Sequence, residues 1–334
     1  MSPAAIRLIQ FLDGARTRVA VSTEGLAAPL REVDSTYELA YRAIRARCPI
    51  ADLAQSLMGA ERYLLSDLDA ERRLRAPIHH PEPTRMLVSG TGLTHLGSAE
   101  ARDRMHRVAH DDEVGLSDSM KMFRMGLRDG KPPGNTRPGV QPEWFFKGTG
   151  ECVANPGSDL LVPSFCGSAA EEPEIVAVYV VDSQGVPHRL GYMLGNDLSD
   201  HVTEQTNYLY LAHSKLLPCS LGPELLLGPL PSEVVGVSRI VRAGRPVWEG
   251  AFLSGEGHMC HSLWNLEYHH FKYPRHRIPD TVHAHFLGCP VMSFNESFET
   301  QSGDVFETSV PAFGYPLRNR LVRDSSAIAP VQSL

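Results

Sequence analysis

Short apolar runs separated by turn residues dominate the pattern of this chain. Near the start, residues 7–11 and 18–21 are mostly apolar, and a glycine follows each run, which is typical of strands joined by tight turns. Further runs that predict strands are residues 86–88, 144–148, 160–163, 174–182, 189–194, 233–241, 281–288 and 304–310. The C-terminal two thirds of the chain is therefore expected to be mainly β.

Helical spacing is limited to a few segments. Ser35 and Glu38 match a capping box, in which the hydroxyl and the carboxylate satisfy backbone N–H groups at the start of a helix. Residues 49–58 are expected to form a second helix, opened by a proline. Two further helices are predicted over residues 98–112 and 117–127. Together with the strands, they predict an α+β protein.

A proline-rich segment, residues 76–83, can continue neither a helix nor a central strand, because proline removes a backbone donor and extends the preceding residue. A domain boundary is therefore placed there. Residues 1–80 are expected to form a small N-terminal α/β domain and residues 81–334 a catalytic domain. Within the latter, residues 81–140 would supply a lid and helical segment, and residues 141–325 a mixed β core.

The charge balance and the cysteines narrow the function classes. The 334-residue chain has 32 Lys+Arg and 39 Asp+Glu, a formal charge of −7, which argues against binding to nucleic acid. Arg7, Gln10 and Asp13 break the first apolar stretch, and no window approaches ~18 uninterrupted apolar residues, so neither an export signal nor a membrane span is expected. The six cysteines form no CxxC motif, as expected of reduced thiols in a cytoplasm.

Three carboxylates lie where predicted strands begin or end. Glu172 and Glu174 stand two residues apart at the start of an apolar strand, so the strand period places them on one face. Asp197 follows the next strand, within a Gly-Asn-Asp turn. Taken alone, the two glutamates are typical of a solvated strand end, and Asn-Asp is typical of a simple turn. Three carboxylates from two strand ends would instead form an open, oxygen-only site that suits Mg²⁺ or Mn²⁺ and a chelating substrate.

In their order along the chain, these motifs resemble those of the fumarylacetoacetate hydrolase superfamily, over roughly residues 6–322. The landmarks are Ala76-Pro77, Gly92-Leu93-Thr94-His95, Phe145-Phe146-Lys147, Glu172-Pro173-Glu174, Gly195-Asn196-Asp197, Ser214-Lys215, Gly222-Pro223, Pro279-Asp280 through Gly288, and Phe313-Gly314-Tyr315-Pro316-Leu317-Arg318-Asn319. The resemblance implies a small N-terminal domain ahead of a catalytic domain built as a mixed β-roll or barrel, and it implies a homodimer.

Carried over position by position, the resemblance implies a metal site beside a substrate site. Glu172, Glu174 and Asp197 would bind a divalent metal, expected to be Mg²⁺, with Mn²⁺ or Ca²⁺ as alternatives. Lys147 and Lys215 would line the substrate site and take part in catalysis. This assignment agrees with the open carboxylate site inferred from the strand ends.

His95 belongs to the segment that the resemblance makes a catalytic lid, where the chain departs from the family pattern. The lid Asn-Tyr is Gly92-Leu93 here. The Glu that usually follows the His by three residues is Ser98, which leaves Glu100 as a displaced candidate for the lid acid. The Gly-Thr turn that closes on a substrate oxygen is Gly288-Cys289, where a weak thiol donor replaces a hydroxyl, so substrate recognition there is expected to differ.

The sequences of three segments, residues 89–98, 141–148 and 269–274, are similar to those of the sugar-acid branch of this superfamily. That branch includes 2-keto-3-deoxy-pentonate dehydratases. With the missing lid Glu, this favours a dehydratase of a 2-keto-3-deoxy sugar acid, in pentose or other carbohydrate degradation. A C–C bond hydrolase of the acylpyruvate or 2,4-diketo acid type is the alternative. A non-catalytic sugar-acid-binding protein on the same fold is a third possibility. In each case the expected partner is a small 2-oxo acid.

The chemistry of 2-oxo acids explains what such a site would do. Their carboxylate and keto oxygens chelate Mg²⁺, which stabilises the enolate formed when C3 loses a proton. In a dehydratase the enolate expels the C4 hydroxyl, whereas in a hydrolase water attacks a C4 carbonyl. His95 is preferred over Lys147 and Lys215 for proton transfer, because an unperturbed imidazole titrates near neutral pH.

Other histidines and a cysteine have simpler interpretations. Pairs with workable zinc spacing are His106/His110, and His258/His261 beside Cys260. Without an HExxH or paired-cysteine motif they are interpreted as ordinary surface or core residues. His283 and His285 share a face of a predicted strand that leads to Gly288, so they are candidates for contacts around the site. The simplest role of Cys289 is steric, since no feature indicates a lowered thiol pKa.

Overall fold

The structure of the protein is a computed structural model that describes residues 5–96, 117–326 and 328–334. Its helices are α1 (Thr36–Ala46), α2 (Ile50–Ser56), α3 (Leu65–Ala70), α5 (Asp118–Asp129), α6 (His201–Thr206), α7 (Leu211–Ser214) and α8 (Leu263–Phe271). Its strands are β1 (Arg7–Asp13), β2 (Arg16–Thr23), β3 (Leu26–Pro29), β4 (Tyr63–Leu64), β5 (Leu74–Arg75), β6 (Met86–Gly90), β7 (Phe145–Thr149), β8 (Val153–Ala154), β9 (Asp159–Pro163), β10 (Pro173–Val181), β11 (Pro187–Asn196), β12 (Cys219–Leu227), β13 (Val234–Arg242), β14 (Arg245–Ser254), β15 (Thr281–Phe286), β16 (Val305–Ser309) and β17 (Leu317–Asp324).

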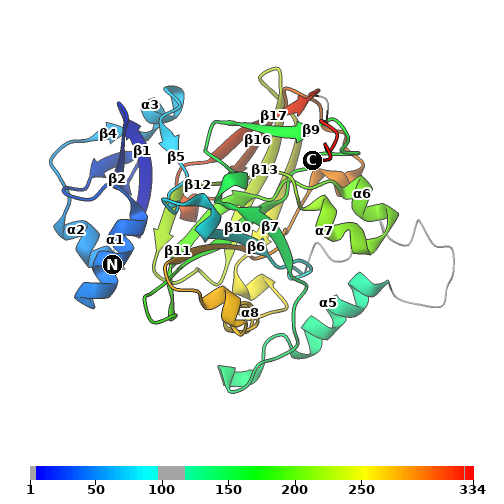
Figure 1. Cartoon of the computed structure of the whole chain (residues 1–334), viewed down its shortest axis with the longest axis horizontal. Helices are drawn as coiled ribbons and strands as arrows, with labels where there is room; N and C mark the ends of the chain where they lie inside the picture. The colour runs from blue at the N-terminus through cyan, green and yellow to red at the C-terminus, as the bar shows by residue number, and fades with distance from the viewer. Residues whose placement is uncertain (1–4, 97–116, 327) are drawn as a thin grey trace.

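A large mixed sheet forms the centre of the molecule (Figure 1). In the described part of the chain its strands follow the order β4-β3-β2-β1-β12-β11-β10-β15-β6-β7, with β5 paired to β1 and β8 to β12. Strand β10 is buried on both faces. Val176 and Val178 pack into one apolar cluster, and Ala177 and Tyr179 pack into another on the opposite face. This central position explains why the sequence of β10 is almost continuously apolar rather than alternating.

A second, five-stranded sheet has the order β14-β13-β16-β17-β9. Its buried residues, among them Leu160, Ile240, Phe306 and Leu321, form a separate apolar cluster with residues from the end of the large sheet. Strand β17 pairs in parallel with β9, whose residues lie far earlier in the chain. The two sheets therefore enclose the ends of the strands that carry the candidate site.

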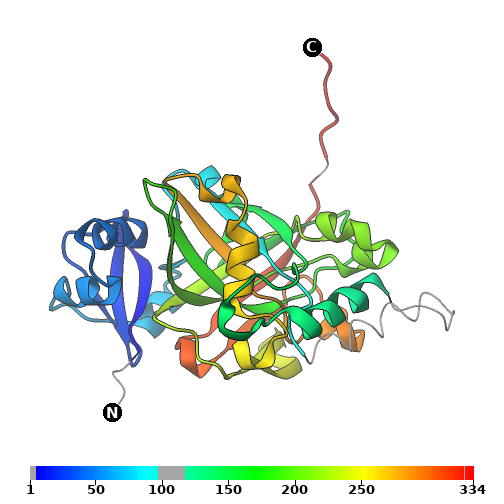
Figure 2. The ribbon, with the colours of Figure 1, turned by 90° about the horizontal axis from the view of Figure 1, so that it is seen from below.

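The N-terminal strands and helices lie at one end of the molecule in both views (Figures 1 and 2). Ser35 caps α1, with its hydroxyl oxygen accepting from the N–H of Glu38 (3.1 Å), as the capping box predicts. The Glu38 carboxylate accepts from the N–H of Asp34 (3.2 Å) rather than that of Ser35. Strand β1 pairs with β12, so this part shares its sheet with the rest of the chain. The boundary near residue 80 stays a prediction.

Every strand predicted from an apolar run overlaps an observed strand, and the mainly β C-terminal two thirds are confirmed. The helix expected over residues 98–112 lies outside the described residues. The elements that were not predicted are strands β4, β5, β8, β12, β14 and β17 and helices α3, α6, α7 and α8. Among the helices of the described residues, none combines the length and the apolar character that crossing a bilayer requires.

Candidate metal centre

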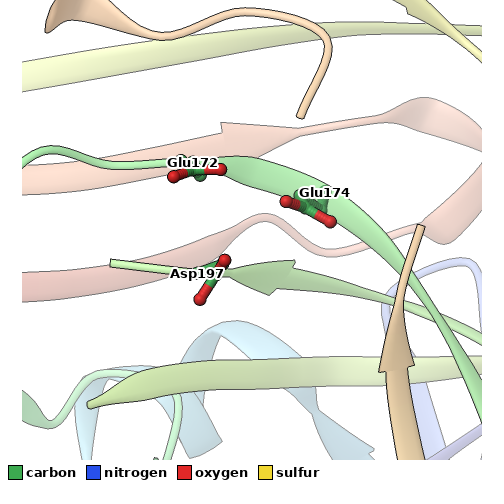
Figure 3. A group of neighbouring side chains, drawn as sticks. All are labelled: Glu172, Glu174 and Asp197. Carbon is green, nitrogen blue, oxygen red and sulfur yellow. The ribbon is translucent and has the colours of Figure 1, made fainter. Parts of the chain in front are cut away.

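An antiparallel hairpin brings the three carboxylates together. Strand β10 begins beside the end of β11, because a short turn joins the two strands and they pair with Glu174 opposite Gly195. Asp197 follows directly, and its N–H donates to the carbonyl oxygen of Glu172 (2.9 Å). Figure 3 shows Glu172 and Glu174 along the start of β10 and Asp197 past the end of β11. The strand period and the hairpin register thus build this cluster.

The three carboxylates are buried and mutually close. Glu172 is 2% exposed, Glu174 3% and Asp197 0%. Each offers one oxygen atom, and these oxygens all lie within 4.8 Å of one another. Within the described residues, no other group of three or more His, Cys, Asp and Glu side chains has this spacing. Carboxylate oxygens alone are the donors that Mg²⁺, Mn²⁺ and Ca²⁺ prefer.

Two buried lysines lie against the cluster, at positions where the sequence predicted them. The Lys215 ammonium donates to Glu172 Oε1 (2.6 Å), to Asp197 Oδ2 (2.7 Å) and to Ser199 Oγ (3.0 Å). The Lys147 ammonium lies 2.7 Å from Asp197 Oδ1. Lys215 also lies over the Phe145 ring, 4.6 Å from its centroid, a cation–π contact. Asp197 therefore faces one ammonium group with each oxygen.

Negative charge remains in excess at this site. Burial raises the pKa of Glu174 well above its ordinary value, and the neighbouring charges of Asp197 and Glu172 raise it further. Burial opposes the charged form of Lys215, but Asp197 and Glu172 outweigh it and raise the pKa of that ammonium. Two ammonium groups do not neutralise three carboxylates in a buried site. The donor set and the charge therefore fit a divalent cation held by Glu172, Glu174 and Asp197.

A backbone turn after β15 fixes the carboxylate of Glu174. The N–H of Gly288 donates to Glu174 Oε2 (2.6 Å). Gly288 has a φ of +104°, and a Cβ atom there would lie 2.1 Å from Thr94 Oγ1. The Thr94 hydroxyl donates to the carbonyl oxygen of Leu287 (2.5 Å). Glycine is therefore required by both the backbone conformation and the close approach of the segment that carries His95.

His95 is buried beside this turn. Because the Thr94 hydroxyl donates its proton to the carbonyl oxygen of Leu287, Thr94 Oγ1 accepts from the Nδ1–H of His95 (3.0 Å). The Nε2 atom then accepts from the hydroxyl of Ser254 (2.8 Å). Burial lowers the pKa of His95 to about 3, and the charge of His258 adds to the effect. The expectation of an unperturbed imidazole does not hold, and the ring is neutral at physiological pH.

The remaining predicted site residues are placed as follows. Glu100 lies outside the described residues. Cys289 is buried next to Gly288, and its thiol donates to the carbonyl oxygen of Val291 (2.9 Å). The thiol is thus engaged in the turn, and its steric role stays a prediction. The catalytic and substrate-binding roles of these residues, like those of Lys147 and Lys215, stay predictions.

Several buried polar residues at the site were not predicted. His201, in α6, lies with Nε2 3.2 Å from Glu172 Oε1 and Nδ1 3.4 Å from Glu204 Oε2. Glu171 accepts from the N–H and the hydroxyl of Ser293 (both 2.8 Å), and burial raises its pKa to about 7 despite these bonds. A sequence signal existed only for Glu171, which adjoins Glu172. His201 and Glu204 have common helix spacing and reach the site only through the fold.

Among the described residues, the histidines with workable zinc spacing do not belong to a group of side chains that could hold a metal ion. His261 bonds to Asn265 (3.1 Å), and the Cys260 thiol donates to the carbonyl oxygen of Leu93 (3.4 Å). His106 and His110 lie outside the described residues. His283 and His285 face helix α8, where each meets the ring of His270.

Comparison with known proteins identifies the fold. No model of a protein family and no curated protein sequence matches the chain. Among solved structures, it is similar to 2-keto-3-deoxy-D-arabinonate dehydratase, both in its apo form and in complex with magnesium and 2,5-dioxopentanoate, with a TM-score of 0.69 at 19% identity. That likeness covers 96% of this chain and 100% of the dehydratase chain.

Two isomerases have a similar architecture. A 5-carboxymethyl-2-hydroxymuconate delta-isomerase from Mycobacterium smegmatis gives a TM-score of 0.57 at 17% identity, over 95% of this chain and all of that chain. A 2-hydroxyhepta-2,4-diene-1,7-dioate isomerase from Mycobacterium marinum gives 0.56 at 14% identity, over 96% of this chain and all of that chain. At these identities the likeness shows the fold. The α+β fold implied by the resemblance is thereby confirmed.

Proposed function

We propose that this protein, whose fold is that of the fumarylacetoacetate hydrolase superfamily, is a divalent-metal-dependent dehydratase of a pentonate-like 2-keto-3-deoxy sugar acid. The observation that carries the proposal is the buried group of Glu172, Glu174 and Asp197 with two lysines against it. The likeness to 2-keto-3-deoxy-D-arabinonate dehydratase, which spans that enzyme's whole chain, supports the choice of reaction.

Glu172, Glu174 and Asp197 would hold the metal, taken to be Mg²⁺. When bound, it supplies Lewis-acid stabilisation of the negative oxygen that develops as C3 of a 2-oxo acid loses its proton. The carboxylates are fixed for this task by the β10–β11 hairpin and by the Gly288 N–H. Such preorganised positions need no rearrangement during the reaction.

Lys147 and Lys215 would bind the acid end of the substrate. Both ammonium groups are almost fully buried and lie on the carboxylate cluster, so they present positive charge where a 2-oxo acid brings its carboxylate and keto oxygens. The three N–H groups of Lys215 already donate to Glu172, Asp197 and Ser199, so Lys215 would act on the substrate through its charge, which a buried site screens little. The lysines would therefore orient the substrate with its C3 and C4 atoms away from the metal ligands.

His95 is the proposed proton-transfer group. Its ring is neutral and its Nδ1–H is held by Thr94, so Nε2 carries no proton and accepts from the Ser254 hydroxyl. In this role Nε2 would exchange the Ser254 hydroxyl for the C3 proton, and a base with a pKa of about 3 depends on the metal to acidify C3. Elimination also needs a proton donor for the departing C4 hydroxyl; Glu100, the displaced candidate for the lid acid, lies outside the described residues. A 2-keto-3-deoxy acid provides the C4 hydroxyl, which an acylpyruvate lacks.

We also propose a homodimer that works in a reducing cytoplasm, within pentose or related carbohydrate degradation. All six cysteines lie in the described residues, and none forms a disulfide. The dimer rests on the family resemblance.

Turnover of the two substrate classes tests the proposal. The purified protein with Mg²⁺ is incubated with 2-keto-3-deoxy-pentonates, 2-keto-3-deoxy-hexonates and acylpyruvates, and the products are weighed by mass spectrometry. The expected result is loss of one water from a 2-keto-3-deoxy acid. Glu174→Gln removes one metal ligand and should abolish this loss, whereas Glu299→Gln, a change at an exposed glutamate, should not.

Two outcomes contradict the proposal. Gain of water by an acylpyruvate with release of pyruvate, and no dehydration, would make the protein a C–C hydrolase. Tight binding of the sugar acids without turnover would make it a binding protein.

A further inference from the structure

A cavity of about 660 Å³ lies between helix α8, the turn that follows it and the segment before β7. Its walls include Trp144, Leu266, His270, Tyr273 and His276. None of the residues proposed for the metal, for catalysis or for substrate binding lines it. Its volume is that of a small-molecule site, for which about 300–1,000 Å³ is typical. The segments 141–148 and 269–274, singled out in the sequence, meet here.

A directed chain of hydrogen bonds fixes the cavity wall. The indole N–H of Trp144 donates to His270 Nδ1 (3.3 Å), so the proton of His270 is on Nε2, which donates to His283 Nδ1 (2.9 Å). The Nε2–H of His283 then donates to Thr281 Oγ1 (3.3 Å), whose proton goes to the carbonyl oxygen of Ile278 (2.7 Å). Each ring has one orientation and one tautomer in this chain. The wall is therefore preorganised rather than loosely packed.

Parallel rings form an aromatic platform in the cavity. Trp144 stacks on His276, with centroids 5.6 Å apart and planes 26° apart, and His276 stacks on His270 at 4.5 Å and 30°. Trp144 nevertheless remains 39% exposed and Tyr273 46%. Trp144, fixed by its stacking and its hydrogen bond, therefore has π-surface open to a planar ligand, next to Tyr273, whose ring packs edge-on against His276 and carries the Lys272 ammonium over it.

The cavity lining includes one cationic side chain, Arg275, and no carboxylate, in a chain that carries −7 overall. Burial lowers the pKa of His269 and His270, so these two rings of the lining are neutral at physiological pH. In the part of the chain that the structure describes, Arg275 forms no ion pair, and Lys272 and Arg277 flank it in sequence. An unpaired guanidinium at the rim of an aromatic cavity matches a carboxylate on the ligand.

We propose that this cavity is a binding site for a planar aromatic carboxylate, separate from the carboxylate centre. The ligand's ring would lie against Trp144 and Tyr273, and its carboxylate would meet Arg275. His270 in the cavity wall bonds to His283 of β15, and β15 leads to Gly288, the residue that donates to Glu174. The cavity wall is thus linked, through His270, to the strand that precedes the turn at a proposed metal ligand.

Calorimetric titration with 2-naphthoate tests the proposal, with 2-naphthylmethanol as its uncharged analogue. The acid is expected to bind at least about tenfold more tightly than the alcohol, because the alcohol lacks the charge-assisted contact. Arg275→Gln should remove that difference, and Trp144→Leu should weaken both ligands by about tenfold. Arg245→Gln, at another exposed arginine, should change neither.

Glu174→Gln separates this site from the proposed catalytic one, since naphthoate binding should survive it. Loss of binding in Glu174→Gln, or binding that Trp144→Leu and Arg275→Gln leave unchanged, would place the ligand elsewhere and overturn the proposal. Absence of binding to the wild-type protein at millimolar concentration would overturn it too. So would light scattering showing that Trp144→Leu and Arg275→Gln dissociate an oligomer, since the cavity would then be an interface between copies of the chain.

Discussion

At the residue scale, what the site can do depends on charged side chains that are almost completely buried. Asp197 meets Lys147 with one oxygen and Lys215 with the other, at 2.7 Å each, and all three side chains are buried. Removing one partner of such a group leaves an uncompensated charge in a medium of low dielectric constant. The lysines are thus important to the folded state as well as to the proposed chemistry.

Lys147→Met should therefore lower the free energy of unfolding by about 3 kcal/mol, because it leaves Asp197 Oδ1 without a counter-charge. Urea unfolding in the presence of a chelator measures this without a contribution from metal. Lys121→Met is the matched control, since Lys121 pairs with Asp118 at the surface, and its effect should stay below about 0.5 kcal/mol. Equal stability of the two variants would show that Lys147 does not neutralise Asp197.

Gly288→Ala should destabilise the protein more than Gly303→Ala, by about 1–3 kcal/mol. Both glycines have similar positive φ angles, +104° and +99°, so the backbone strain is shared. A Cβ atom at Gly288 would lie 2.1 Å from Thr94 Oγ1, whereas one at Gly303 meets nothing within 4 Å. Thermal unfolding with a turnover assay checks this, and Gly288→Ala alone should lose activity. Equal behaviour of the pair would refute the role given to this turn.

The sequence predicted part of this site. The sequence indicated the three carboxylates of Glu172, Glu174 and Asp197 because they flank two apolar strands that form a hairpin. The pairing of strands that are neighbours in sequence is enough to bring them together. His201 and Glu204 could not be found in this way, since they approach Glu172 through the position of α6. The pKa of His95 also depends on the fold, because it follows from burial rather than from neighbours in sequence.

At the scale of elements, strands with an unbroken apolar run were easier to predict than strands whose run is interrupted. Strand β10 is an unbroken apolar run because it lies between two apolar clusters. Strand β17 alternates buried leucines with arginines, and β14 has mostly exposed residues, so neither has a continuous run. Strand β12 contains Gly222-Pro223, and proline weakens a strand prediction because it lacks a ladder donor. Strand β14 forms a hairpin with its neighbour β13, so these missed strands share an interrupted apolar pattern rather than a kind of pairing.

The packing of α8 on β15 predicts an acid-sensitive fold. Burial lowers the pKa of His283 and His285 to about 3, with a contribution from His276, against an ordinary value of 6.5. Between these values the unfolded chain binds more protons than the folded one, so stability should fall as pH drops below 6.5, by up to about 1.4 kcal/mol per pH unit for each imidazole. Urea unfolding at several pH values measures the slope.

His213→Gln is the control for this slope, since His213 is exposed and its replacement should leave the pH dependence unchanged. His283→Gln should reduce the slope of unfolding free energy against pH by the amount that one buried imidazole contributes, up to about 1.4 kcal/mol per pH unit. Stability that is flat or rises on acidification would contradict buried, neutral rings at this interface.

At the scale of the whole molecule, the proposed N-terminal domain and the rest of the chain share one apolar core. Leu8, Val19 and Leu39 pack in the same cluster as Val176 and Phe286. Strand β1 pairs with β12 and extends the large sheet. One apolar cluster thus joins segments from both sides of the proline-rich stretch near residue 80, where the domain boundary stays a prediction.

Residues 81–334 expressed alone should consequently fail to unfold cooperatively, because β12 would become an exposed apolar edge. Co-expression of residues 1–80 should restore a soluble complex, and circular dichroism melting of both preparations checks this. Cooperative unfolding of the isolated 81–334 segment would show that the boundary separates two independent domains.

The claim on which the proposed function depends is that three buried carboxylates form a divalent-metal centre. Electron paramagnetic resonance titration with Mn²⁺ tests it most directly, since the free ion gives a signal that binding removes. The wild-type chain should bind one Mn²⁺ tightly, Glu174→Gln should lose this binding, and Glu299→Gln should keep it. Equal Mn²⁺ binding by the wild type and Glu174→Gln, or no binding by either, would contradict the metal centre.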